Sequence, residues 1–70
     1  MKFLLIMQIC SLANAECMPP QKIYPMYNSH YDCSFGGYLR GLTIIRELGQ
    51  TEVDQAKIYV NFSCQELNYS

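Results

Sequence analysis

The stretch "CSFGGYLRGLTIIRELGQ", residues 33–50, decides the fold, because no other segment of the chain has so convincing a helical pattern. Asp32 or Ser34 is available as the N-cap of this helix, and Gly49 is a typical stop. Large apolar side chains recur at helical spacing and form an apolar stripe. They are Phe35, Tyr38, Leu42, Ile45 and Leu48.

A second strip of the same helix carries small residues. Gly37 and Gly41 lie four residues apart, and Cys33 lies four residues before Gly37. Each glycine costs about 1 kcal/mol relative to alanine inside a helix, so a close contact should offset that loss. The strip continues to Ile44 or Ile45, and we expect another backbone to approach it.

Residues 57–64, "KIYVNFSC", predict the strand that makes this approach. Ile58, Val60, Phe62 and Cys64 alternate with polar or amphipathic residues, as in a half-buried strand. The helix rises about 22 Å and this strand about 23 Å, so a strand that folds back brings Cys64 level with Cys33. We therefore predict a Cys33–Cys64 disulfide, which would contribute about 3–4 kcal/mol. Residues 51–56, "TEVDQA", suggest a short helical turn between helix and strand.

Residues 1–15 have the order of a secretory signal peptide. Lys2 supplies the positive start, residues 3–10 are almost wholly apolar, and Ala13-Asn14-Ala15 matches a small-x-small cleavage site. We expect cleavage after Ala15 and a periplasmic or secreted product. The alternative is that residues 3–9 form a buried strand or short helix of the domain. A membrane span needs about 20 apolar residues, and Glu16 before Cys17 is the wrong order for a lipoprotein.

The rest of the chain predicts one very small α+β domain stapled by a disulfide, with one main helix packed on a C-terminal strand. Residues 16–31 hold all three prolines and predict an extended Pro/Tyr arm, residues 32–66 a helix-turn-strand module, and residues 67–70 a tail. With Cys10 inside the signal, Cys17 has no partner. We expect Cys17 to be unpaired, or to pair between chains and form a dimer.

The helix, the acidic link and the strand motif "F-x-C-x-E", formed by Phe62, Cys64 and Glu66, resemble small exported proteins of unknown function from marine phages and their bacterial hosts. The resemblance covers residues 32–66 and implies export and a helix-strand unit. It carries over no catalytic residue.

Composition and spacing favour binding over catalysis. The chain has 5 basic and 6 acidic residues, so it offers no basic patch for nucleic acid. A thiol-active pair of His30 and Cys33 would need Cys33 free, and a zinc site would need reduced cysteines at tighter spacing. We expect no catalytic residue, metal or cofactor.

The tyrosines of the arm suggest what the protein does instead. Tyr24, Tyr27 and Tyr31 are amphipathic contact residues of a kind enriched at interfaces. We predict an exported binding protein whose partner is an envelope or extracellular protein, acting as an inhibitor or exclusion factor. The alternatives are a structural component of an envelope or particle, and a zinc or thiol-active module.

Overall fold

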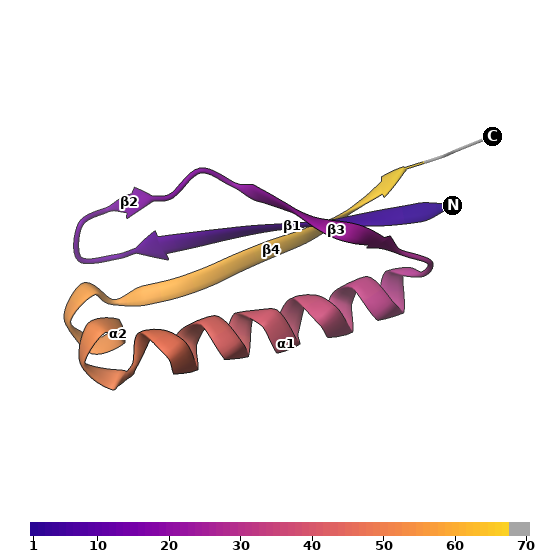
Figure 1. The fold of residues 1–70 in the computed structure, drawn as a ribbon. Helices are drawn as coiled ribbons and strands as arrows, with labels where there is room; N and C mark the ends of the chain where they lie inside the picture. The colour runs from indigo at the N-terminus through magenta and orange to yellow at the C-terminus, as the bar shows by residue number, and fades with distance from the viewer. Residues whose placement is uncertain (68–70) are drawn as a thin grey trace.

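A computed structural model of the chain describes residues 1–67 and shows a small α+β domain of two helices and a four-stranded antiparallel sheet (Figure 1). The order of elements is β1 (Lys2–Ser11), β2 (Glu16–Cys17), β3 (Gln21–Tyr27), α1 (His30–Leu48), α2 (Gln50–Ala56) and β4 (Ile58–Leu67). The predicted fold class is confirmed, including the main helix against a C-terminal strand. Of the predicted tail, only Leu67 is described, at the end of β4; residues 68–70 lie outside the described residues.

The sheet is built around β1. Along one edge, β4 pairs with the whole of β1, from Lys2 opposite Leu67 to Ser11 opposite Ile58. Along the other edge, β3 pairs with the first part of β1 and β2 with its end. Residues 16–31, predicted as an extended arm, are largely extended, and the two strands they contribute belong to the sheet.

One face of the sheet is covered by α1, which lies along it as a single layer (Figure 1). Alternate β1 side chains point toward this helix, because successive residues of a strand face opposite sides. Leu5 and Cys33 are 0% exposed and, with Met7, form the centre of the core. Phe62 and Val60 of β4 pack around them.

The ends of α1 are defined by two residues. Ser29 is the N-cap, and its Oγ accepts a hydrogen bond of 3.1 Å from the backbone N–H of Asp32. The helix thus begins at His30, earlier than predicted, and the caps expected from the sequence, Asp32 and Ser34, both lie inside it. Gly49 ends the helix as predicted, with φ of 87°, a value that favours glycine.

The link between α1 and β4 contains the short helix α2, where the sequence suggests a helical turn. The backbone at the end of α2, residues 56–57, also forms hydrogen bonds with the turn that follows β1. The backbone N–H groups of Leu12 and Ala13 donate to the carbonyls of Lys57 and Ala56, at 3.0 and 3.2 Å. Ser11 Oγ donates to the same Ala56 carbonyl at 2.5 Å. The turn after β1 is therefore hydrogen-bonded to the corner between α2 and β4.

The central strand uses residues that the sequence predicts to be a signal peptide. In the structure they take the alternative form, a buried strand, with Leu4, Leu5 and Met7 each at most 4% exposed. Cleavage after Ala15 concerns processing and stays a prediction. One molecule cannot both be cleaved after Ala15 and form this four-stranded sheet, because a chain that begins at Glu16 lacks β1. Within residues 1–67, neither helix combines the length and apolarity that a transmembrane helix requires.

Candidate functional site

The side of α1 that faces away from the sheet carries several exposed large apolar side chains. We call it the outer face, and it consists of Tyr31, Phe35, Tyr38, Leu39 and Leu42. These side chains are 74%, 56%, 72%, 51% and 58% exposed, respectively. They recur at the spacing of one helix side, so they form a continuous apolar strip. Charged residues normally occupy this side of a surface helix.

The outer face is exposed because α1 packs on the sheet through its small residues. The Cys33–Cys64 disulfide joins the helix to β4 with a Cα–Cα distance of 6.1 Å. A Cβ placed on Gly37 would lie 2.5 Å from ring atoms of Phe62, and one on Gly41 would lie 3.7 Å from Val60 Cγ1. The small strip of the sequence is thus the buried side, as predicted, although side chains rather than a backbone fill the space.

The outer face also contains residues that the sequence reasoning did not place in a site. Their helical spacing is plain in the sequence, but it is equally typical of a core-facing stripe. Two stripes on opposite sides of one helix cannot both face the sheet. Cys33 shows which of the two stripes faces the sheet, because a disulfide to β4 requires Cys33 to face inward.

Two ring contacts hold parts of the outer face in place. Tyr31 stacks on Phe35 with ring centroids 6.3 Å apart and an interplanar angle of 19°. Tyr38 meets Phe62 of β4 edge to face, with centroids 4.8 Å apart. Such pairs contribute about 0.5–1.5 kcal/mol beyond the area that they bury. The aromatic side chains are therefore partly ordered before any partner arrives.

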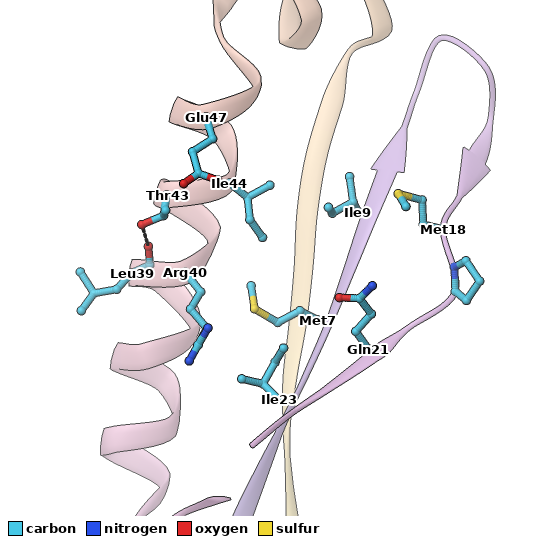
Figure 2. Close-up of a pocket in the computed structure, with 11 residues that line it drawn as sticks. Met7, Ile9, Met18, Gln21, Ile23, Leu39, Arg40, Thr43, Ile44 and Glu47 are labelled. Carbon is cyan, nitrogen blue, oxygen red and sulfur yellow. Dashed lines mark hydrogen bonds between the residues drawn. The ribbon is translucent and has the colours of Figure 1, made fainter. Parts of the chain in front are cut away.

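A hollow of about 410 Å³ lies beside the outer face, between α1 and the β1–β3 side of the sheet (Figure 2). Its sheet side is mainly apolar, with Met7, Ile9 and Ile23, while Arg40 and Glu47 supply charge from α1. Leu39 belongs to both the hollow and the outer face. The apolar surface of α1 therefore continues around the helix into this hollow.

The three tyrosines predicted as an interface are not brought together. Tyr31 lies on the outer face of α1, whereas Tyr24 lies on β3 and is 61% exposed. Tyr27 is half-buried over the helix, where a Cβ on Gly36 would lie 2.7 Å from its Cζ. Only Tyr31 of the three belongs to the candidate surface.

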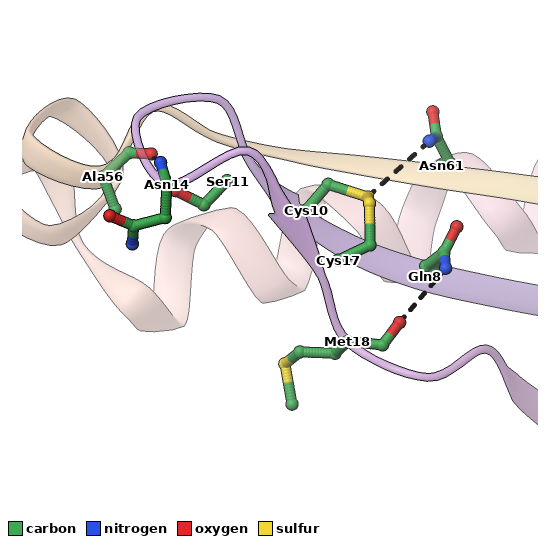
Figure 3. Close-up of a disulfide and its surroundings, with 8 residues drawn as sticks. All are labelled: Gln8, Cys10, Ser11, Asn14, Cys17, Met18, Ala56 and Asn61. Atoms are coloured by element: carbon green, nitrogen blue, oxygen red, sulfur yellow. Dashed lines mark hydrogen bonds between the residues drawn. A yellow bond between two sulfur atoms is a disulfide. The ribbon is translucent and has the colours of Figure 1, made fainter.

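The predicted Cys33–Cys64 disulfide is confirmed, and the expectation for Cys17 is wrong. Cys17 bonds to Cys10, because the antiparallel pairing of β1 and β2 places the two residues directly opposite each other, with Cα atoms 4.0 Å apart (Figure 3). Asn61 Nδ2 donates toward Cys10 Sγ at 3.9 Å. A dimer linked through Cys17 would first require this bond to open.

The thiol-active and zinc alternatives depend on cysteine and histidine side chains whose positions the structure gives. The His30 and Cys33 pair has no free thiol, because Cys33 is in a disulfide. His30 is exposed, and its ring packs edge to face on Phe3, with centroids 5.8 Å apart. Among residues 1–67, no three His, Cys, Asp or Glu side chains gather where a metal ion could be held. The arrangement can present apolar and aromatic side chains to a partner.

Comparison of the chain with known proteins finds no matching protein-family model, no matching curated protein and no matching solved structure.

Proposed function

We propose that this chain is a small binding protein that acts by contact, and that the outer face of α1 is its contact surface. The observation that carries the proposal is the exposure of five large apolar side chains on one side of a helix whose other side is already packed. Contiguous apolar patches are uncommon on monomeric proteins and mark interaction sites. Aromatic side chains are enriched among the residues that dominate binding energy.

We also propose that the protein works outside the reducing cytoplasm. Its two disulfides suit an oxidising compartment. A periplasmic or secreted location would fit an envelope or extracellular protein as the target, with an inhibitory or exclusion role. The resemblance to small exported proteins is in keeping with this location.

Export makes a prediction that intact-mass measurement checks. Protein recovered from the periplasm or medium of an exporting host should begin at Glu16 if the signal peptide is cleaved. That result would mean that the exported form lacks β1, so the four-stranded fold would not be the working form. A full-length mass with both disulfides would instead refute cleavage and identify the described fold as the exported species.

The contact surface is tested by one substitution and a matched control. Leu42→Glu places a charge in the outer face, and Leu12→Glu makes the same change at a leucine that is 68% exposed in the turn after β1. Neither side chain is in the core, so both variants should keep the melting temperature of the wild type within a few degrees. Each would be used as tagged bait against an extract containing an untagged copy of the chain.

We expect wild type and Leu12→Glu to capture the same stoichiometric protein, and Leu42→Glu to capture at least tenfold less, because a buried charge without a partner opposes binding. Equal capture by all three proteins would show that the contact surface lies elsewhere.

A further inference from the structure

We infer that the partner fitted by the outer face is a second copy of this chain, docked with its α1 antiparallel to the first. The inference rests on the proposed function in taking the outer face as the contact surface, and it names a second copy, in place of an envelope or extracellular protein, as the partner that this surface binds. Its basis is that the outer face is self-complementary about a point between Tyr38 and Leu39. An isologous dimer requires such a surface, because each residue must meet its symmetry-related counterpart.

The spacing of the residues gives the contacts directly. In an antiparallel pair centred between positions 38 and 39, Tyr38 lies opposite Leu39 of the second copy, and Phe35 lies opposite its Leu42. Four of the five side chains of the outer face then meet another apolar side chain. Tyr31 lies opposite Arg46 of the second copy, where an arginine can pack on an aromatic ring.

Charge decides between antiparallel and parallel docking. Asp32 lies in the first turn of α1 and Arg46 in its last turn. Antiparallel docking brings Asp32 of each copy to the end that carries Arg46 of the other, so opposite charges meet at both ends. Parallel docking would pair like charges at both ends and would align the two helix dipoles unfavourably.

The area of the outer face sets the strength of the dimer. Aromatic side chains measure roughly 150–250 Å² each, and the three in the outer face are 56–74% exposed, so they offer about 300–500 Å² per copy. With the two leucines, the dimer buries on the order of 1,000 Å² in total, the low end for a specific interface. We therefore expect a reversible dimer with a dissociation constant on the order of micromolar or weaker.

Sedimentation equilibrium of the full-length, oxidised chain tests the dimer. Over about 1 μM to about 1 mM, the measured mass should rise from 8.1 kDa toward twice that value. Leu42→Glu should stay monomeric over the same range, whereas Leu12→Glu should behave as wild type.

A charge swap tests the antiparallel arrangement. Arg46→Glu should weaken the dimer severalfold by placing a second acidic residue beside Asp32 of the other copy, and Asp32→Lys combined with Arg46→Glu should restore it. Arg40→Glu is the matched control, because Arg40 lines the hollow beside α1 rather than the outer face. Circular dichroism at dilute concentration would verify that each variant is folded.

The outcomes separate this inference from the proposed function. A chain that is monomeric at every concentration overturns the dimer, while the contact surface stands if Leu42→Glu still loses a captured partner. A dimer that Leu42→Glu leaves intact overturns the outer face as the dimer interface, and it overturns the contact surface as well if Leu42→Glu also captures as much as the wild type. A dimer that Leu42→Glu breaks but the charge swap does not restore overturns the antiparallel arrangement.

Discussion

Replacing Gly37 with alanine should destabilise the domain, although glycine to alanine in a helix normally stabilises by about 1 kcal/mol. The added Cβ would lie 2.5 Å from Phe62 Cδ1 and Cε1 and 2.9 Å from its Cγ. Contact with Cγ, at the root of the ring, means that rotation of Phe62 about its side chain gives little relief, and Tyr38 packs against the same ring. Overpacking of this kind costs about 1–3 kcal/mol. After the helix-propensity gain of about 1 kcal/mol is subtracted, we expect a net loss of about 1 kcal/mol.

Gly41→Ala is the matched control, because its Cβ would lie 3.7 Å from Val60 Cγ1, an ordinary contact distance. This variant should gain about 1 kcal/mol from helix propensity, so the two alanine variants should differ by about 2 kcal/mol, the overpacking cost at Gly37. For a domain of this size, that difference corresponds to melting temperatures about 8–16 °C apart.

The assay is thermal unfolding by circular dichroism of the oxidised proteins. Gly37→Ala should cost less stability in a Phe62→Leu background than in the wild type, because the smaller side chain leaves room for the added methyl group. The comparison is between the double variant Gly37→Ala/Phe62→Leu and Phe62→Leu alone. A Gly37→Ala protein that melts at or above the wild-type temperature would refute the close packing of α1 on β4.

Two further predictions concern the helix start and the disulfides. Ser29→Ala should lower the free energy of unfolding by about 1 kcal/mol, measured by urea titration, because the amide of Asp32 loses its cap; an unchanged midpoint would contradict the cap. Replacing Cys33 and Cys64 together by serine should cost about 4 kcal/mol, whereas the same change at Cys10 and Cys17 should cost about 2 kcal/mol. The difference follows from loops of 31 and 7 residues, and equal losses in thermal melts would argue against this pairing.

The helix and its strand could be predicted from the sequence because several local signals agree there. The alternation of residues 58–64, the stop at Gly49 and the matched lengths of helix and strand together placed Cys64 beside Cys33. The small strip containing Gly37 correctly indicated a close contact.

The central strand and the second disulfide could not be predicted in the same way. A short apolar run such as residues 3–9 is compatible with a signal peptide or a buried strand. Assigning it to a signal removed Cys10 from the count and left Cys17 without a partner. The outer face is hard to recognise for a related reason, because its spacing is that of a core stripe. The sequence signal that separates the two sides of the helix is Cys33, whose disulfide to β4 requires it to face inward.

The pairing of β1 with β4 has a consequence for how the protein folds during synthesis. β1 takes β4 as its long neighbour, with Lys2 opposite Leu67, although α1, α2 and two strands lie between them in the sequence. Pairing between segments so far apart raises the contact order, which slows folding. At about 5–20 residues per second, synthesis from the end of β1 at Ser11 to the start of β4 at Ile58 lasts roughly 2 to 9 s.

During that interval, β1 lacks its main partner strand, β4. Factors that bind apolar segments of an emerging chain can therefore reach the side chains of β1. If residues 1–15 act as a signal peptide, as proposed, folding and export would compete for the ten residues of β1. The time available for this competition is set by how far along the chain Ile58 lies.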